Sequence, residues 1–451
     1  MSFRMGTILV SFVIFCMISF SSGLPLLENP SEGGKIWALL VAGSNGYWNY
    51  RHQADICHAY QILHRYGIPD ENIITMMYDD IATDSSNPMP GKIINKPGGK
   101  DVYSGVLKDY TGDDVNKDNF LNILQGNSSA MKNIGSGKVI ASGPYDHIFV
   151  NFVDHGSTGL LCFPNDYLYA DELMKTLKKM TNDKKFKKLL LYIEACEAGS
   201  MFENLLPTNT KILASTASNA DESSYGCYCD EPEFDTCLGD LYSVTWMEHL
   251  DALTPKKEQK ETILSEYRYV KKHVNESHVT LYGDRNNLGS NRVKSFLGSK
   301  KKLTEMTAVT NPNLNVIASR DVVIESINKQ IKRESSDIKK ASLIQTLSYM
   351  KKMRQQVDQT ISAIISETSH EININILNQR YPVTLDIMPC YKDLIQQFSE
   401  NCFNPLKNPY VLRYFYVFIN MCSMDSINKN EIKAIFKTKC TDKQRQALNI
   451  Q

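Results

Sequence analysis

The sequence of 451 residues lacks net charge, because 50 lysines and arginines balance 50 aspartates and glutamates. This balance gives no support for binding to nucleic acid or for general adhesion to membranes. Internal repeats are absent too, and no apolar run beyond the first 23 residues approaches the roughly 20 residues that cross a bilayer. With 42% hydrophobic and 22% charged residues, the composition is that of a globular protein rather than a disordered one.

The one long apolar run, Thr7–Ile18, follows Arg4 and is itself followed by small residues. This layout is typical of a cleaved signal peptide, and the run is too short for a membrane-spanning helix. We therefore predict a signal peptide over residues 1–23 and a short leader or propeptide over residues 24–33. The mature chain is then expected to carry no stable membrane span.

Eleven cysteines agree with passage through the secretory pathway, where disulfides form. Four of them crowd the C-terminal part and predict a domain stapled by two bridges, with three possible connectivities: Cys390, Cys402, Cys422 and Cys440. The sequons at Asn127 and Asn275 are candidate glycosylation sites in such a chain.

The balanced charge is unevenly distributed along the chain. Residues 331–451 contain 17 basic and 11 acidic side chains, a net charge of +6, so the rest of the chain carries −6. A basic tail therefore follows an acidic body, and the two are expected to attract each other.

Short apolar runs alternate with helical patterns over residues 34–298, which predicts an α/β domain with a mainly parallel sheet flanked by helices. The predicted strands are Lys35–Gly43, Asn72–Tyr78, His147–Val153, Lys188–Ile193 and Lys211–Ser215, and the predicted helices are Ala54–Tyr66, Ala170–Met180, Leu241–Leu250 and Ile263–Val274. Residues 299–330 are expected to form a linker. Residues 331–451 are expected to be mainly helical, especially over Ile338–Ile365 and Tyr410–Met421.

Two predicted strands end in reactive residues, His155 after the third strand and Cys196 after the fourth. Parallel strands end at the same edge of a sheet, so the two side chains should lie close together. A thiolate nucleophile with a neighbouring imidazole is the arrangement of a cysteine-dependent acyl transfer, and the amides of Gly156 and Cys196 could stabilise the oxyanion. Taken singly, Cys196 could be an inert core cysteine and His155 a surface loop histidine. No finger-like spacing of cysteines or histidines surrounds them, so neither a metal nor another cofactor is expected.

The residues around these two positions resemble the legumain family of asparaginyl endopeptidases. The matching segments are Gly43–Gly46, Asn49–Asp55, Met76–Asp80, Asp109–Gly112, Asp154–Gly156, Glu194–Ser200, Ser223–Tyr225 and Gly239–Asp240, and the cysteine-bearing tail resembles the family's inhibitory prodomain.

The resemblance implies a caspase-like fold, hydrolysis of protein and peptide substrates after asparagine, and slower cleavage after aspartate in acid. It implies that Cys196 and His155 form the catalytic dyad and that Asn49 positions the imidazole. It also implies a substrate pocket lined by Arg51, His52, Glu194, Ser223, Ser224 and Asp240, and a possible succinimide at Asp154. Inhibitors of the cystatin type, and an endolysosomal, vacuolar, digestive or secreted location, follow from the same resemblance.

The chemistry of the pocket residues is consistent with that substrate. Arg51 and His52 can donate to the oxygen of a side-chain amide, and two carboxylates can accept from its nitrogen. An aspartate substrate would meet those carboxylates as a like charge unless a group is protonated, so acid should widen specificity toward aspartate. A purely structural ion-pair network of Arg51, Glu194 and Asp240 is the alternative.

Two details depart from the best-known vertebrate pattern of the family. Ala198 stands where many family members have serine, and Cys229 and Cys237 resemble a pair found in plant relatives.

The basic tail is expected to control the activity. It would cover the cleft of a zymogen and be loosened by acid. Self-processing would require an exposed asparagine, for which Asn328 is favoured over Asn313 and Asn315.

Three other functions remain open at this stage. A peptide ligase would use the same residues and pass the acyl group to an amine. The catalytic subunit of the lipid-anchor transamidase shares a similar histidine and cysteine arrangement, but it would need a C-terminal membrane span. A catalytically silent binding protein could keep the fold, although every residue of the dyad and pocket is present.

Overall fold

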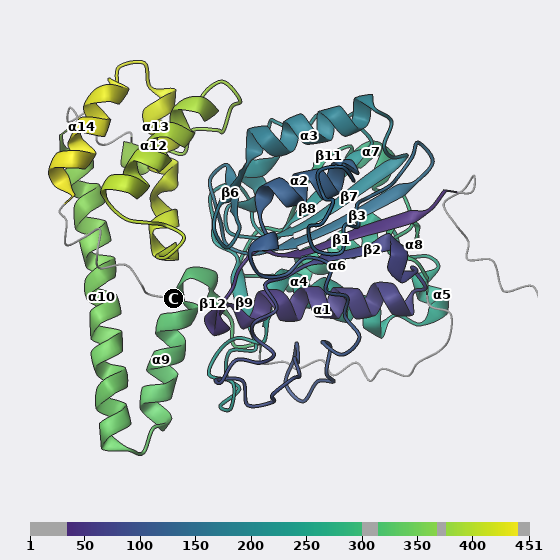
Figure 1. Cartoon of the computed structure of the whole chain (residues 1–451), viewed down its shortest axis with the longest axis horizontal. Coiled ribbons are helices and arrows are strands. Elements are labelled where there is room, and N and C mark those ends of the chain that lie inside the picture. The colour runs from purple at the N-terminus through teal and green to yellow at the C-terminus, as the bar shows by residue number, and fades with distance from the viewer. Residues whose placement is uncertain (1–33, 300–313, 368–375, 441–451) are drawn as a thin grey trace, which may run out of the picture.

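The computed structural model describes residues 34–299, 314–367 and 376–440, and its N-terminal part is built on a six-stranded sheet (Figure 1). The strand order is β11-β8-β7-β3-β1-β2. All neighbours are parallel except β11, which pairs with β8 in the antiparallel sense. The strands are β1 (Ile36–Ala42), β2 (Ile73–Met76), β3 (His147–Val153), β7 (Lys188–Glu194), β8 (Ile212–Thr216) and β11 (Thr280–Gly283).

Both faces of this sheet are buried, as expected for parallel strands with helical crossovers. Along β1, Leu39 and Val41 contribute to the apolar core on one face, and Ala38 and Leu40 contribute to the core on the other. This alternation follows from the two-residue period of a strand. The five predicted strands are confirmed, with bounds that differ by at most two residues at either end.

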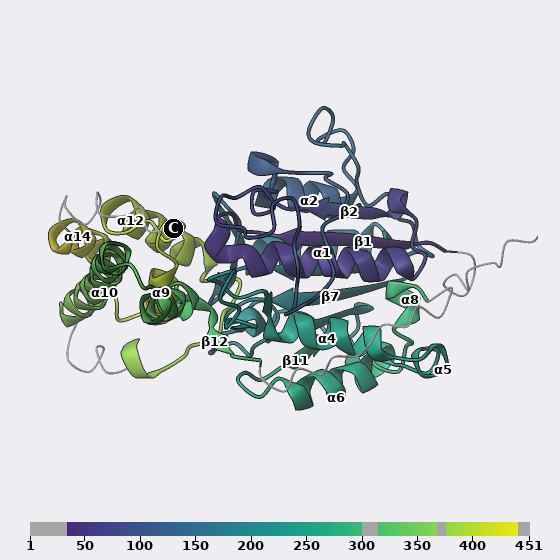
Figure 2. The same ribbon diagram turned by 90° about the horizontal axis from the view of Figure 1, so that it is seen from below.

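Helices cover the sheet on both sides (Figures 1 and 2). One face carries α1 (Tyr50–Arg65), α4 (Leu241–Ala252) and α6 (Ile263–His273), and the other carries α2 (Lys117–Gln125) and α3 (Ala170–Asn182). The short helices α5 (Pro255–Glu258), α7 (Arg285–Leu288) and α8 (Lys294–Leu297) lie in the connections.

Helix α1 begins at Tyr50, four residues before the predicted start. The prediction missed its first turn because that turn is polar and nevertheless buried. Arg51, His52 and Gln53 are each 1% exposed. A prediction based on an apolar stripe cannot include such residues.

The C-terminal region is helical and disulfide-linked, as predicted. It comprises α9 (Val322–Arg333), α10 (Asp337–Ser366), α12 (Met388–Asn401), α13 (Phe415–Ser423) and α14 (Lys429–Lys439). Of the three connectivities left open for the C-terminal cysteines, the structure has Cys390–Cys422 and Cys402–Cys440. Cys229 and Cys237, which resemble a pair found in plant relatives, are also bonded to each other. The apolar core of these helices is continuous with the core under α2 and α3.

The predicted linker over residues 299–330 is wrong in its second half. Strand β12 (Ile317–Ala318) pairs with the catalytic domain, and α9 then begins at Val322. Asn328 was expected in an exposed connection, but it lies within α9 and is half-buried. Helix α9 was missed although Ile324, Ile327 and Ile331 recur at the spacing of an amphipathic helix.

The predictions about glycan sites, the signal peptide and membrane spans can be compared with the structure only in part. Asn127 and Asn275 are both exposed, as a glycan acceptor must be. Asn313, the predicted signal peptide and the 24–33 leader lie outside the described residues. Among the helices that the structure describes, none has the length and apolar character needed to span a membrane.

Candidate active site

The loops that follow β3 and β7 are in direct contact at one edge of the sheet. Val153 pairs with Glu194, and the amide of Asp154 donates to the Glu194 carbonyl at 3.0 Å. A Cβ atom on Gly156 would lie 2.6 Å from the Cys196 carbonyl oxygen, so only glycine fits there. The structure therefore brings the His155 loop onto the Cys196 loop, as the sequence predicted.

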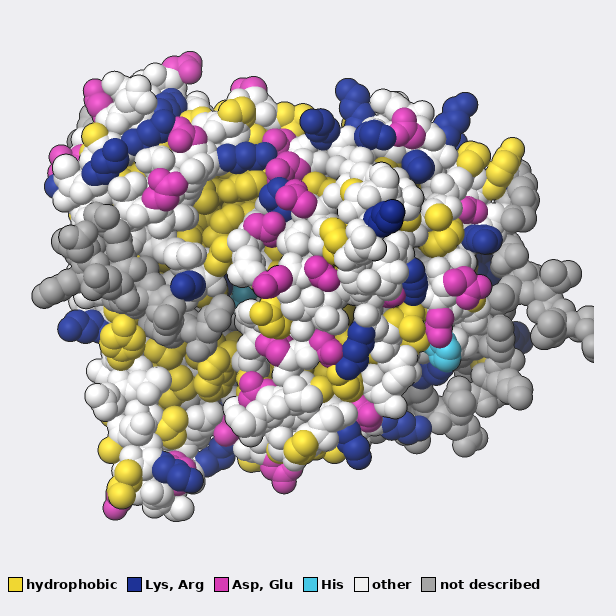
Figure 3. Space-filling view, viewed as in Figure 1, with side chains coloured by type: hydrophobic (Ala, Val, Ile, Leu, Met, Phe, Trp, Pro, Cys, Tyr) yellow, Lys and Arg dark blue, Asp and Glu magenta, His cyan; other side chains and the backbone are white. Residues whose placement is uncertain are grey.

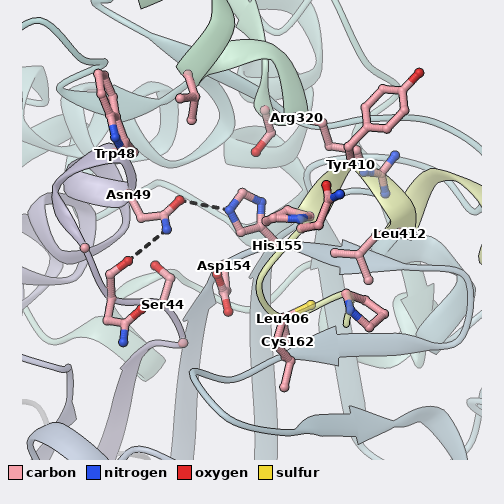
Figure 4. A pocket seen from close by; sticks show the side chains of 18 of the residues that line it. Ser44, Trp48, Asn49, Asp154, His155, Cys162, Arg320, Leu406, Tyr410 and Leu412 are labelled. Atoms are coloured by element: carbon pink, nitrogen blue, oxygen red, sulfur yellow. Dashed lines mark hydrogen bonds between the residues drawn. The ribbon is translucent and has the colours of Figure 1, made fainter. Parts of the chain in front are cut away.

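Asn49 orients the imidazole of His155 (Figure 4). Its Oδ1 lies 2.9 Å from His155 Nε2, and its Nδ2 donates to the Asn45 carbonyl at 2.9 Å. The second bond fixes the orientation of the amide, so Nε2 must carry the hydrogen that Oδ1 accepts. The lone pair of Nδ1 is then free to take a proton, and Nδ1 has no hydrogen-bond partner among the described residues.

Burial and nearby charges favour the neutral forms of both His155 and Cys196 in this closed form of the chain. Burial lowers the pKa of His155 well below its usual value, and the charges of Arg51 and Arg320 lower it further. Burial raises the pKa of the Cys196 thiol, against the opposing effect of Arg320. Cys196 is fully buried, and its Sγ accepts a bond from the Ser224 amide at 3.3 Å. Ser223, which precedes Ser224 in the chain, is half-buried.

Four of the predicted pocket residues come together in a buried cluster: Arg51, His52, Glu194 and Asp240. Arg51 Nε donates to Asp240 Oδ1 at 2.9 Å, so the ion pair considered as a structural alternative does exist. Glu194 Oε2 accepts from the amide of Ser243 at 2.9 Å and from its hydroxyl at 3.0 Å. His52 Nδ1 is 2.6 Å from the Ser44 hydroxyl.

Three polar atoms of this cluster nevertheless have no hydrogen-bond partner among the described residues. They are His52 Nε2, Glu194 Oε1 and Asp240 Oδ2. Burial raises the pKa of both carboxyl groups, and their repulsion adds to the shift at Glu194. A buried polar atom without a partner costs about 1–3 kcal/mol, which a ligand with complementary donors and acceptors would recover.

A segment that precedes α9 covers the pocket in the manner of a bound strand. Ile317 and Ala318 of β12 pair antiparallel with Gly226 and Tyr225 of β9 (Tyr225–Cys227). The pairing continues where the Ser319 amide donates to the Ser224 carbonyl at 2.9 Å. Short strand β10 (Gly239–Asp240) lies on the other side of β9 and carries Asp240.

Ser319 is the residue of this segment that enters the pocket. It is 3% exposed, and its hydroxyl accepts a bond from the Arg51 guanidinium at 2.8 Å. This role of Ser319 could not be predicted from the sequence, because it depends on the register of β12 against β9. The Ser319 hydroxyl bonds to Arg51 and leaves the three atoms named above without a hydrogen bond, although His52 Nε2 and Asp240 Oδ2 lie 3.7 Å apart.

His52, Asp154 and His155 form a cluster whose ligand-type atoms lie within 4.8 Å of one another. Each histidine already has a defined partner, Ser44 for His52 and Asn49 for His155. Burial raises the pKa of Asp154 well above its usual value, which favours the neutral carboxyl over an anionic ligand. The three residues therefore fit a hydrogen-bond network better than a metal site.

Comparisons with known proteins match this chain over nearly its whole length. The model of the Peptidase C13 family matches residues 36–299, and that of the legumain prodomain matches residues 342–440. Legumain from Bos taurus is 44% identical over 421 residues, which cover 91% of this chain and 94% of that protein.

More distant relatives cover a similar share. Hemoglobinase from Schistosoma mansoni is 42% identical, over 90% of this chain and 92% of that protein. The vacuolar-processing enzyme delta-isozyme from Arabidopsis thaliana is 40% identical, over 90% and 91%. Caspase-1 from Spodoptera frugiperda aligns in structure with a TM-score of 0.34 and 12% identity, over 62% of this chain and 93% of that one.

Proposed function

The chain belongs to the Peptidase C13 family, and from this premise we propose which of its residues carry the activity. It is a cysteine endopeptidase that cleaves after asparagine and is made with a prodomain. Our proposal assigns the nucleophile to Cys196, the proton transfers to His155 and the selection of asparagine to the buried pocket.

In the proposed reaction, the Cys196 sulfur attacks the carbonyl carbon of the asparagine residue, and its proton passes to His155 Nδ1. The amides of Gly156 and Cys196 would stabilise the negative charge that develops on the carbonyl oxygen. His155 then donates the proton to the leaving amine, and the carbon–nitrogen bond breaks. Water, activated by the same imidazole, hydrolyses the thioester.

The unpaired atoms of the pocket are the observation that carries the choice of asparagine. Glu194 Oε1 and Asp240 Oδ2 are acceptors for the two hydrogens of a side-chain NH2 group. Arg51 is a donor for its oxygen, and here it donates to the hydroxyl of Ser319 instead. A site built to hydrogen-bond a substrate group rejects analogues that lack it by about 10⁴-fold or more.

Cleavage after aspartate would require a proton on the substrate carboxyl or on a pocket carboxylate. The raised pKa of Glu194, caused by burial and by Asp240, makes such a proton available in acid. Activity on aspartate is therefore expected to grow relative to asparagine as the pH falls.

The prodomain blocks this site, and we propose that its release is the activating step. Tyr391 is fully buried at the seam and donates to the Thr158 carbonyl, and Ser157 donates to the Leu412 carbonyl. Ion pairs across the seam join the basic residues of the C-terminal region to acids of the catalytic domain: Arg320–Glu197, Lys329–Asp230, Arg333–Asp235 and Lys392–Asp171. Acidic side chains gather along the catalytic side of the seam (Figure 3).

The site of self-processing remains part of the proposal. Asn315 precedes β12, whereas cleavage at Asn328 would require the middle of α9 to unfold first, because a peptide must be extended to pair with β9. Relatives named vacuolar-processing enzymes agree with an acidic lytic compartment as the place of action. Inhibitors of the cystatin type would have to present an asparagine to the same pocket.

A peptide electrophile tests the assignment of the site. The acid-activated chain is incubated with a short peptide ending in an asparagine chloromethyl ketone, and with the matched glutamine peptide, and the modified cysteine is located by mass spectrometry. We expect the asparagine reagent to alkylate Cys196 and the glutamine reagent to react far more slowly. Labelling of Cys57, Cys162 or Cys227 instead would contradict the proposal. Adding an amine-terminated peptide to a normal substrate would then measure how much acyl group goes to ligation.

A further inference from the structure

Arg320 follows the pocket residue Ser319 and bonds to Glu197, the residue directly after the proposed nucleophile. The register of β12 on β9 puts Ser319 in the position of the residue before the scissile bond, so Arg320 takes the position of the residue after it. Its charge acts on the pKa of both His155 and Cys196, which places it beside the dyad. Arg320 is seen close to His155 in Figure 4.

The hydrogen-bond partners that the structure gives the Arg320 guanidinium both belong to the catalytic domain. Arg320 Nη1 donates to Glu197 Oε1 at 3.0 Å, and its Nη2 donates to Glu197 Oε2 and, at 2.8 Å, to the Gly156 carbonyl. The two side chains are 8% and 11% exposed. A two-pronged pair of this kind is strong and geometrically selective.

The backbone of the catalytic domain holds Glu197 in place. Glu197 adopts a left-handed conformation with φ of 48°, directly after the nucleophile, and its amide donates to the Glu222 carbonyl at 2.7 Å. Such a backbone angle is uncommon for a residue other than glycine and is kept only where the surroundings enforce it. The carboxylate should therefore remain beside Cys196 when the prodomain has left.

We propose that Glu197 and the Gly156 carbonyl form a recognition site for an arginine or lysine directly after the cleaved asparagine. This inference rests on the proposed function and names a preferred class of substrate, the Asn–Arg and Asn–Lys bonds. Loss of the prodomain leaves Glu197, which is buried in the closed form, without its cation, and removal of one partner of a buried ion pair is unfavourable. A basic substrate residue restores the pair, so part of the binding energy depends on the residue after the scissile bond.

Matched peptides that differ only after the asparagine test this proposal. The acid-activated, fully processed enzyme is assayed at pH 6 on peptides with Asn–Arg, Asn–Lys, Asn–Gln or Asn–Glu bonds. We expect kcat/KM for Asn–Arg to exceed that for Asn–Gln by about tenfold or more, the value of one charge-assisted interaction, with Asn–Glu the poorest. In Glu197→Gln the ratio of Arg to Gln should fall close to one, whereas Glu203→Gln, an exposed glutamate of the same loop, should keep it.

Equal kcat/KM for the Arg, Lys and Gln peptides in the wild-type enzyme would overturn the inference while leaving cleavage after asparagine intact. A ratio that survives in Glu197→Gln would assign the preference to another residue and would also overturn it. If the processed enzyme cleaved none of the asparagine peptides, the proposed function itself would fail, and the inference with it.

Discussion

Glu266 gives the clearest prediction about how acidity supports this fold. It lies in α6, is 1% exposed, and accepts a hydrogen bond from the Tyr192 hydroxyl, while its Oε1 has no partner among the described residues. Burial raises the pKa of the Glu266 carboxyl to about 8, and the nearby charge of Glu261 adds to the shift. The folded chain therefore binds a proton here that the unfolded chain, with a pKa near 4.5, has already released.

The sign and size of the effect follow from that difference. Between pH 4.5 and 8 the folded state holds more protons at this residue, so its contribution to stability is present in acid and is lost as the pH rises. A shift of this size corresponds to about 4 kcal/mol by pH 8, at roughly 1.4 kcal/mol per pH unit. Glu266→Gln mimics the protonated form, because its amide keeps an acceptor for Tyr192 and cannot ionise.

The measurement compares urea unfolding of Cys196→Ala with that of Cys196→Ala/Glu266→Gln at pH 5, 6, 7 and 8, in a background that cannot cleave itself. We expect similar unfolding midpoints at pH 5, and a growing advantage for the glutamine variant up to pH 8. Glu203→Gln in the same background controls for the loss of one exposed carboxylate. Two midpoint curves that stay parallel from pH 5 to pH 8 would refute the reasoning.

Three further predictions concern the dyad and the prodomain. Asn49→Ala should lower kcat by about 10–100-fold with a smaller change in KM, because His155 loses the bond that sets its tautomer; steady-state kinetics of the processed enzyme would show this, and an unchanged kcat would contradict it. Arg320→Met should make the precursor open, and become active, at a higher pH than the wild type, because breaking a buried ion pair costs about 3 kcal/mol; activation profiles from pH 4 to 7 that coincide would refute the role of this pair. Tyr391→Phe removes the bond to Thr158 and should weaken docking by about 1 kcal/mol, measured as faster activation at a fixed pH, and a slower rate would count against the contact.

Much of the catalytic domain could be predicted from apolar runs, since the five predicted strands are buried and appear in the sequence as short hydrophobic segments. His155 and Cys196 were predicted for a related reason, because they follow two such runs and parallel strands end at one edge. The start of α1 was missed, since Arg51 and His52 are polar residues that are buried where they form part of the pocket. Local hydrophobicity carries no sign of that requirement.

The covering segment could not be predicted because its role depends on contacts between distant parts of the chain. Ser319 enters the pocket only through the register of β12 on β9, and Arg320 meets Glu197 from more than a hundred residues away in sequence. The pairing of the C-terminal cysteines is of the same kind, because the sequence permits three connectivities and the packing of α12, α13 and α14 selects one.

Cleavage of matched peptides is the sharpest test of Cys196 as the nucleophile and of the pocket as the site that selects asparagine. The precursor and its Cys196→Ala variant are first held at about pH 4 to 5, where carboxylates begin to protonate, with loss of the prodomain checked by mass. Both are then assayed on peptides with Asn, Asp, Gln or Ala before the same bond. We expect cleavage after asparagine, slower cleavage after aspartate that increases as the pH falls, and no cleavage by the variant. Cleavage that persists in Cys196→Ala, or equal rates after Asn and Gln, would contradict it.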